Sequence, residues 1–429
     1  AGIALGKIAE IHPECFLDAS IAVKILPLLS QGLKAQPRVS SHIAKAWSHL
    51  GEALARHPEG HSLTLDDFIL ANLENAFRTD LNPSDYSLID NSLLGVMSLL
   101  HCCNNKQTIR KFLEVIITQL ENSGSLSGDR KKFIQSGLLS CMQNALLHYE
   151  APPNDALAER SYQTIIALFK SMNDVTADGM HALAGCASAM GTGFAIHMEE
   201  AWGLLSVSLQ RTNESDLFGA CIGALIEISR ACPSQFAYVL PKLVPFLIER
   251  LNDNNFDRFL KLSIFTAMGD MALGCTELII NYLPQILAIY DMALEAGIKK
   301  PSDLTPEYQE YVEQLRDGFI ESFICFMHGV EESKKIADLF QYLPKVITFL
   351  QSTCVKLYNP TIDYLRNSLA LLADVAKFYG KASRAIIDTR FTSELIGILR
   401  KASGTKDQKS NQFIIEYADD IFKDVFSNQ

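Results

Sequence analysis

The sequence lacks long apolar runs and a recognisable targeting segment. No stretch of the 429 residues is both long and apolar enough to span a bilayer. The longest uncharged stretch, residues 179–198, is rich in Gly, Ala, Ser and His, which favours a buried helix and a turn at "GTG" over a membrane segment. No signal peptide precedes the first helical pattern, and the chain starts without Met. We therefore expect a fragment that begins in the second helix of a repeat.

Paired cysteines and an excess of basic residues are also missing. The ten Cys residues form no Cys-x-x-Cys pair, and nearly all sit singly in apolar helical patterns. This indicates reduced thiols in a protein of the cytoplasm or nucleus, because a disulfide framework belongs to small secreted chains. Lys and Arg number 38 against 49 Asp and Glu, which gives a formal net charge of −11. The balance argues against nucleic acid and acidic membranes as partners and favours a basic ligand.

The side-chain patterns of an enzyme are absent as well. No nucleophile and base can be assembled into a set, so a helical hydrolase has no support. Gly185, Gly191 and Gly193 lack the strand–loop–helix context that a phosphate-binding loop requires. His57 and His61 are four residues apart, but Pro and Gly between them prevent the helix that would direct both rings to one metal. We expect no catalytic residue, no metal and no cofactor, and predict that the protein is not an enzyme.

Helical periodicity, in contrast, covers nearly the whole chain, and almost no segment alternates like a strand. The helices come in pairs separated by Pro, Gly, Asn or Asp. The expected first and second helices are 18–33 with 37–56, 64–78 with 84–102, 106–121 with 129–149, 156–171 with 176–190, 194–210 with 215–231, 235–251 with 256–274, 277–296 with 306–329, 333–352 with 360–379, and 384–402 with 408–426. Residues 2–11 resemble a second helix without its partner.

The spacing of similar positions indicates a repeat. Glu10 and Glu52 are 42 residues apart, and Glu227 and Asp270 are 43 apart. Two-helix periods of about 40–47 residues are typical of HEAT arrays. A helix pair cannot bury its apolar faces alone, so neighbouring pairs must stack into a continuous core. We predict an all-α protein, with residues 1–429 forming a single α-α superhelix (solenoid) of about ten HEAT repeats.

Carboxylates occupy the middle of several apolar helical stretches. In "AMGDMALG", Asp270 shares its helix face with the positions four, seven and eleven residues earlier, whereas Met268 and Ala272 lie on the opposite face. In a two-helix solenoid the second helices line the concave side. Carboxylates at equivalent positions of successive second helices would therefore form a negative groove for a basic ligand. An ordinary solvated helix face is the alternative. The acidic candidates for the groove are Glu52, Asp216, Glu227, Asp270, Glu310, Asp317, Glu321, Asp363, Asp374 and Glu416.

Four segments also carry a family resemblance. They are "QPRVSSHIAKAWSHLGEAL" (36–54), "IGALIEISRA" (222–231), "FDRFLKLSIFTAMGDMALGCTELIINYLPQILAIYDMALEAGI" (256–298) and "YVEQLRDGFIESFICFMHGV" (311–330). Their order and spacing resemble roughly the C-terminal half of the importin-β (karyopherin-β) family of nuclear transport receptors. The resemblance implies that second-helix carboxylates wrap the basic, helical N-terminal segment of the adaptor importin-α, or similar basic cargo proteins. The positions that match the family's acidic pattern are Glu52, Glu227, Asp270, Glu321 and Asp374.

The resemblance has further implications and two departures. Tyr417 stands where the family commonly has a Trp that packs on the ligand, and an aromatic ring there can stack on a guanidinium. Lys45 stands at another such Trp position, with Trp47 two residues later, and its charge would oppose a basic ligand. Phe-Gly nucleoporins are implied as partners in pockets between first helices, with 194–210, 235–251 and 277–296 as candidates.

The family relation also implies a cellular setting. Ran-GTP is expected to bind only weakly, because the repeats that dominate this contact in the family precede the matched half. The implied localisation is the cytoplasm, the nucleus and the nuclear envelope at pore complexes. A HEAT scaffold or regulatory subunit of another complex remains the alternative, since it shares the solenoid although not the ordered family segments.

Overall fold

The structure is a computed structural model, and it describes residues 19–55, 66–78, 86–172, 174–275, 279–332, 336–355, 358–402 and 408–426, with a few single residues before them. Within these ranges every element is an α-helix or a 3-10 helix. The chain divides into two compact units, unit 1 (Ala1–Cys232) and unit 2 (Pro233–Gln429), which we describe separately. The predicted helix at 2–11, which includes Glu10, lies largely outside the described residues, as do His57 and His61.

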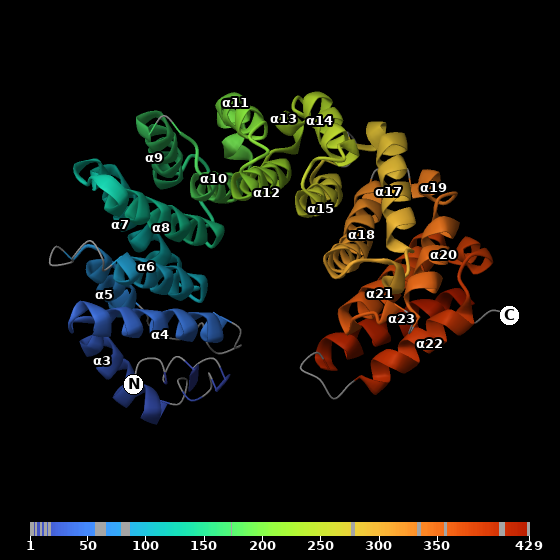
Figure 1. Cartoon of the computed structure of the whole chain (residues 1–429), viewed down its shortest axis with the longest axis horizontal. Helices are drawn as coiled ribbons and strands as arrows, with labels where there is room; N and C mark the ends of the chain where they lie inside the picture. Colours follow the sequence, from blue (N-terminus) through green and yellow to red (C-terminus); the bar gives the residue numbers. More distant parts are fainter. Residues whose placement is uncertain are drawn as a thin grey trace. The chain divides into compact units, whose positions relative to one another are not determined.

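Unit 1 contains five helix pairs in its described part (Figure 1). The first helices are α3 (Ala19–Leu33), α5 (Asp66–Ala76), α7 (Lys106–Asn122), α9 (Ala156–Met172) and α11 (Met198–Ser208). The second helices are α4 (Pro37–Ala55), α6 (Tyr86–His101), α8 (Gly128–Leu147), α10 (Ala177–Met190) and α12 (Ser215–Ala231). Each second helix packs on the second helix of the next pair, so these helices form one layer, which we call the second-helix layer.

Unit 2 repeats this arrangement with four pairs in the part that the structure describes. The first helices are α14 (Leu240–Asn252), α17 (Leu283–Gly297), α20 (Leu343–Thr353) and α22 (Thr389–Lys401). The second helices are α15 (Arg258–Gly274), α18 (Pro306–Glu332), α21 (Ile362–Tyr379) and α23 (Gln408–Phe426). Helix α15 packs on α18, α18 on α21, and α21 on α23. None of the described helices of either unit is long and apolar enough to cross a membrane.

The predicted fold class is confirmed by these two stacks. Second helices begin at residues 37, 86, 128, 177 and 215 in unit 1, and at 258, 306, 362 and 408 in unit 2. Most of these intervals are close to the period of about 40–47 residues that HEAT arrays show. The second helices also begin and end within three residues of the predicted bounds.

The first helices differ from the prediction because several are divided. The expected helix 194–210 is a 3-10 segment, η3 (Gly191–His197), followed by α11, and the expected helix 235–251 is a short α13 (Pro233–Phe236) followed by α14. Proline opens the first turn of α14, α17 and α20, at Pro241, Pro284 and Pro344. Proline presets the helical φ and lacks the N–H that the first turn leaves unpaired, so a new helix starts there.

Glycines set the distance between second helices. A Cβ placed on Gly269 of α15 would lie 2.6 Å from the backbone oxygen and 2.7 Å from the Cα of Ser322 on α18. One placed on Gly51 of α4 would lie 2.7 Å from the carbonyl carbon of Ser98 on α6. Atoms at these separations overlap, so only glycine permits the observed approach. In both helices the glycine is followed by a carboxylate, Glu52 or Asp270.

An aromatic cluster fixes α18 against α17 in unit 2. The Tyr290 ring lies 5.5, 5.6 and 6.0 Å from the rings of Phe319, Phe323 and Phe326, measured between centroids. The Tyr290 hydroxyl also shares a 2.8 Å hydrogen bond with the Ser322 hydroxyl. These four aromatic side chains are fully buried, and they hold one face of α18 inward so that the opposite face carries the charged residues.

Candidate protein-binding site

Unit 2 gathers the predicted acidic residues onto one layer. Its four second helices are consecutive neighbours, and each carries at least one of them. The positions are Asp270 on α15, Glu310, Asp317 and Glu321 on α18, Asp363 and Asp374 on α21, and Glu416 with Tyr417 on α23. We call this set the acidic face. Glu310, Glu321, Asp363 and Glu416 are exposed, Asp270, Asp317 and Tyr417 are half-buried, and Asp374 is buried.

On α18 the carboxylates of Glu310 and Glu321 accept hydrogen bonds from amides, and no ion pair joins either of them to a cation among the described residues. Gln314 donates from Nε2 to Glu310 Oε1 at 3.4 Å. Asn367, on the neighbouring α21, donates from Nδ2 to Glu321 Oε1 at the same distance. An amide donor holds a carboxylate in place without neutralising its charge. The negative charge of α18 therefore remains available to a ligand.

Asp317 shows the effect of this charge density. Burial, followed by the neighbouring charges of Glu321 and Asp363, raises the pKa of Asp317 to about 6. The adjacent guanidinium of Arg316 opposes this shift only in part. Arg316 is directed away from the acidic face, since its Nε donates to the carbonyl oxygen of Gly297 at 2.7 Å. Burial and like charges held close together make the ionised form of a carboxylate costly.

Asp374 is the centre of a bridge across three helices. His328 Nε2 of α18 lies 3.0 Å from Asp374 Oδ2, and the Tyr417 hydroxyl of α23 donates to Asp374 Oδ1 at 2.6 Å. The hydrogen bond to Asp374 raises the pKa of His328. Burial, and then the same carboxylate, raises the pKa of Tyr417. Asp374 is only 6% exposed, so its two oxygens are used within the protein and its role is to join α18, α21 and α23.

Other predicted residues are paired to arginine or to an amide. Asp363 forms an ion pair with Arg366 one turn later on α21. Glu227 of unit 1 pairs with Arg230 at 3.1 Å on α12. Glu416 accepts a 2.6 Å hydrogen bond from Gln412 Nε2. A ligand cation would have to compete with arginine at the first two positions, which makes them weaker candidates than the carboxylates of α18.

Unit 1 does not bring its three candidates into one cluster. Glu52 is exposed on α4, whereas Asp216 and Glu227 lie on α12, and α6, α8 and α10 stand between these two helices. Asp216 is in the first turn of α12, where a carboxylate is favourable next to the helix N-terminus. The second-helix layer of unit 1 therefore lacks the contiguous acidic face of unit 2 in its described part.

The departure near the start of unit 1 involves two residues, Lys45 and Trp47, which the structure places differently. Lys45 is exposed on α4, so a basic ligand would meet its charge. Trp47 is fully buried and stacks on Phe68 with 4.5 Å between ring centroids. Trp47 is therefore a core residue that joins α4 to α5, and it is not available to a ligand.

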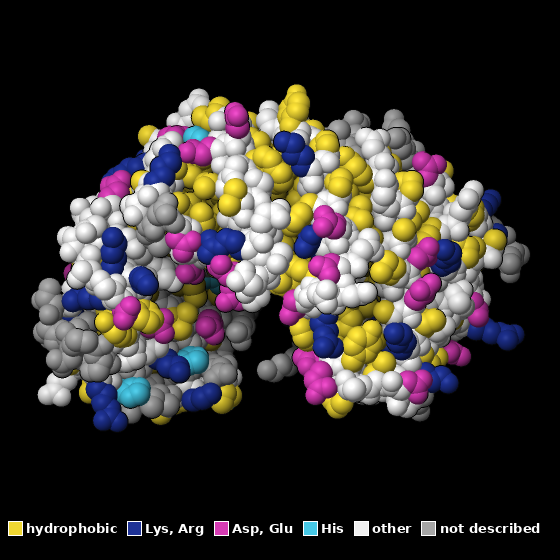
Figure 2. Space-filling model, turned by 45° about the horizontal axis from the view of Figure 1, so that its top comes forward, with side chains coloured by type: hydrophobic (Ala, Val, Ile, Leu, Met, Phe, Trp, Pro, Cys, Tyr) yellow, Lys and Arg dark blue, Asp and Glu magenta, His cyan; other side chains and the backbone are white. Residues whose placement is uncertain are grey.

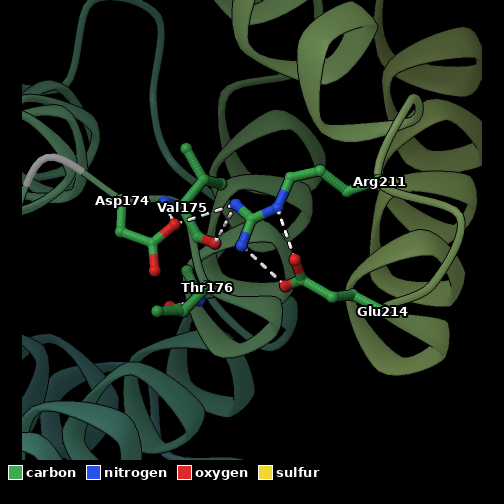
Figure 3. Close-up of polar contacts among 6 residues, drawn as sticks. Asp174, Val175, Thr176, Arg211 and Glu214 are labelled. Carbon is green, nitrogen blue, oxygen red and sulfur yellow. Dashed lines mark hydrogen bonds and ion pairs between the residues drawn. The ribbon is translucent and has the colours of Figure 1, made fainter.

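The sequence did not predict a polar network around Arg211, which closes one end of a pocket between the first helices α9 and α11 of unit 1. Arg211, in the loop before α12, donates from Nε and Nη2 to the two carboxylate oxygens of Glu214 at 2.7 and 2.6 Å (Figure 3). Its Nη1 donates to Asp174 Oδ1 at 2.8 Å and to the Val175 carbonyl oxygen at 3.3 Å. The network closes a 380 Å³ pocket between α9 and α11, where Val207 is 68% exposed.

A second pocket lies between the first helices α17 and α20 of unit 2. Its volume is about 520 Å³, and Leu294, Ile298 and Phe349 supply apolar walls. Lys345 and Asp291 form a 2.9 Å ion pair beside it. In Figure 2, which turns the top of the molecule towards the viewer, apolar side chains reach the surface between charged ones. Both pockets involve first helices that the sequence named as candidates, 194–210 and 277–296. The ion pairs Arg211–Asp174 and Lys345–Asp291 beside them join residues far apart in sequence.

Metal ligands do not gather in the part of the chain that the structure describes. No group of three or more His, Cys, Asp or Glu side chains is arranged there to hold an ion. The buried thiols are poor nucleophiles too, since burial raises the pKa of Cys102 and Cys141 to about 12.

Comparison with known proteins gives consistent matches over nearly the whole chain. The family model "Importin subunit beta-1-like, TPR repeats" matches residues 24–402. Importin subunit beta-1 of Arabidopsis thaliana is 20% identical over 416 residues, which cover 91% of this chain and 47% of the relative. The solved structure of yeast importin-beta (Kap95p) superposes with a TM-score of 0.81 at 17% identity, covering 99% of this chain and 50% of the other. The Kap95:Nup1 complex gives the same values. The chain thus spans about half the length of the relatives it matches.

Proposed function

Since the chain belongs to the importin subunit beta-1-like family, we propose that it is part of a nuclear transport receptor whose acidic face binds a basic helical segment. The single observation that carries this proposal is the row of α18 carboxylates held by amides, with the pKa of Asp317 raised to about 6 by burial and neighbouring carboxylates. Such a surface is unfavourable on its own and becomes favourable when cations approach it.

Several ion pairs formed together between the ligand and the acidic face are needed for tight binding. One exposed ion pair contributes only about 0.2–1 kcal/mol. A ligand helix that covers α15, α18 and α21 desolvates several carboxylates at once, and each further 1.4 kcal/mol strengthens binding about tenfold. Asp317 and Glu321, two residues of the acidic face on α18, are expected to make the principal contacts with the ligand. Asp374 is expected to act through Tyr417 and His328 without touching the ligand.

The ligand that the family relation favours is the basic N-terminal segment of importin-α, and similar basic cargo segments have the same chemistry. The negative charge of the whole chain, −11, supports this choice over an acidic partner. In this role the protein would work in the cytoplasm, in the nucleus and at pore complexes. The family relation implies no catalysis. Ran-GTP is expected to contribute little through this half alone.

A second function is favoured by the two first-helix pockets. Protein pockets that bind small ligands commonly have volumes of about 300–1,000 Å³ and largely apolar walls, which leaves room for a phenylalanine ring. The pockets of 380 and 520 Å³ meet this condition, and they lie between successive first helices. The related Kap95 has been solved as a Kap95:Nup1 complex. We infer that these pockets take the Phe rings of Phe-Gly nucleoporin segments.

The test of the main proposal is a titration of the full chain with an importin-α N-terminal peptide at about 50 and 200 mM salt, since exposed charges are screened beyond roughly 8 Å at physiological ionic strength. The double variant D270K/E321K should weaken binding at least tenfold and reduce the salt dependence. The control E394K makes one such charge reversal on the exposed side of α22 and should have little effect.

Unchanged affinity in a folded D270K/E321K protein would refute the acidic face as the binding site. Recovery of a phosphatase or kinase from cell extract, without importin-α or nucleoporins, would instead favour the scaffold alternative.

A further inference from the structure

Unit 1 contains a further pocket, and its lining residues differ from those of the two pockets described above in carrying an excess of positive charge. It lies between α7, the short 3-10 helix η2 (Ser123–Ser125), the start of α8, and α9, and its volume is about 440 Å³. Eight of the twelve residues that line it have polar or charged side chains, with Lys131, Gln135, Arg160 and Gln163 among them. No aromatic side chain lines it. We call it the α7–α9 pocket.

The base of this pocket is polar and firmly held. Gln135 and Ser123 are 3% and 2% exposed, and Gln135 Nε2 donates to Ser123 Oγ at 2.8 Å. Thr164, also buried, donates to the carbonyl oxygen of Arg160 at 2.8 Å. These hydrogen bonds satisfy the buried polar groups and fix the shape of the base.

The charged residues that line the pocket, Lys131, Arg160 and Glu121, leave an excess of one positive charge. Arg160 forms an ion pair with Glu121, and its Nε donates to Glu121 Oε1 at 2.9 Å. This hydrogen bond lowers the pKa of Glu121, so the carboxylate remains ionised and neutralises the guanidinium. Lys131 is half-buried at the pocket wall, and no ion pair or hydrogen bond joins its ammonium to another described residue. On a chain with a net charge of −11, this local balance is unusual.

We propose that the α7–α9 pocket binds a carboxylate side chain of an acidic peptide, with Lys131 as its counter-ion. The single excess positive charge matches one carboxylate. A phosphate dianion would carry more charge than Lys131 offsets and would face the Glu121 carboxylate. The volume also exceeds what a small ion needs. The proposal depends on unit 1 alone, so it stands or fails independently of the acidic face and of the Phe-Gly pockets.

The test uses the full chain and two labelled peptides, acetyl-(Glu-Ser)₆ and acetyl-(Gln-Ser)₆, followed by fluorescence anisotropy at low salt. The Glu peptide should bind, and K131E should weaken it at least fivefold. The matched control is K132E, because Lys132 is the next residue on α8, is exposed and does not line the pocket. K132E should change the affinity less than twofold. K131Q removes the charge but keeps a polar side chain of similar length, and its affinity for the Glu peptide should lie between those of the wild type and K131E. Circular dichroism checks that each variant is folded.

Three results would overturn the proposal. One is equal loss of affinity in K131E and K132E, which would indicate a diffuse charge effect. Another is equal binding of the Glu and Gln peptides. The third is displacement of the Glu peptide by inorganic phosphate, but not by chloride of the same ionic strength, which would make the pocket a phosphate site.

Discussion

The close approach of α15 and α18 can be tested by replacing one glycine with alanine. Helix propensity alone predicts that Gly269→Ala stabilises the protein by about 1 kcal/mol, because alanine is the better helix former. The structure predicts the opposite sign. The new Cβ would lie 2.6 and 2.7 Å from backbone atoms of Ser322, and a backbone cannot rotate away as a flexible side chain can.

The two effects differ enough in size to decide the outcome. Overpacking in a close-packed interior costs about 1–3 kcal/mol, and contacts with backbone belong at the upper end of that range. After subtracting the gain in propensity, we expect G269A to destabilise unit 2 by about 1–2 kcal/mol. Gly397 of α22 is the matched control, since a Cβ there meets no atom within 4 Å. G397A should therefore stabilise the same unit by about 0.5–1 kcal/mol.

The assay is urea unfolding followed by two signals. Both tryptophans of the chain, Trp47 and Trp202, lie in unit 1, so fluorescence reports on unit 1 while circular dichroism reports on all helices. G269A should lower the circular dichroism midpoint with little change in the fluorescence midpoint, and G397A should raise it. A G269A protein as stable as G397A would refute the reasoning, because the glycine would then have no packing role.

Two further predictions concern the bridge through Asp374. Since the pKa of His328 is raised in the folded state, its stabilising effect is complete below the unfolded pKa of about 6.5 and is lost as pH rises through the raised value. His328 is the only histidine of unit 2, so H328Q should flatten the decline in thermal stability of unit 2 between pH 6.5 and 8; an unchanged profile would contradict the bridge. Tyr417→Phe should destabilise unit 2 by about 1–3 kcal/mol by removing a hydrogen bond from a buried carboxylate. Tyr238→Phe, at an 82% exposed tyrosine, should be neutral in the same urea titration.

The sequence was sufficient to predict the helix pairs and which helix of each pair carries the acidic candidates. This succeeded because apolar spacing within one helix determines which face is buried, as at Asp270, and because the pairs repeat. It was not sufficient for the partners of the acidic residues. The pairing of His328 with Asp374, 46 positions apart, depends on the register between α18 and α21, which neither periodicity nor spacing specifies.

Several first helices start later than predicted because of a proline, and the regular spacing of apolar residues gives no sign of these breaks. Pro241, Pro284 and Pro344 each fall inside an expected helix, and apolar spacing continues across them. Giving the proline more weight than the apolar spacing would have predicted the positions where these helices start. The buried role of Trp47, in contrast, needs the position of Phe68 in the next helix and has no signal in its own segment.

The raised pKa of Asp317 leads to a prediction that separates a true cation site from a merely acidic surface. With a pKa of about 6, Asp317 is roughly half protonated at pH 6 in the free protein. A ligand ammonium or guanidinium placed beside it favours the ionised form, so binding should release about half a proton at pH 6 and almost none at pH 8.

Calorimetric titration of a basic peptide in two buffers of different ionisation enthalpy measures this release directly. The apparent binding enthalpy should depend on the buffer at pH 6 and not at pH 8. D317N should abolish the buffer dependence while preserving the shape of the site, whereas E394Q on α22 should leave it unchanged. Glu321→Gln removes a charge that raises the pKa of Asp317, and it should therefore shift the proton release to lower pH. Buffer-independent enthalpies at pH 6 would mean that the ligand's cations bind elsewhere, because no cation can approach Asp317 closely without displacing its proton.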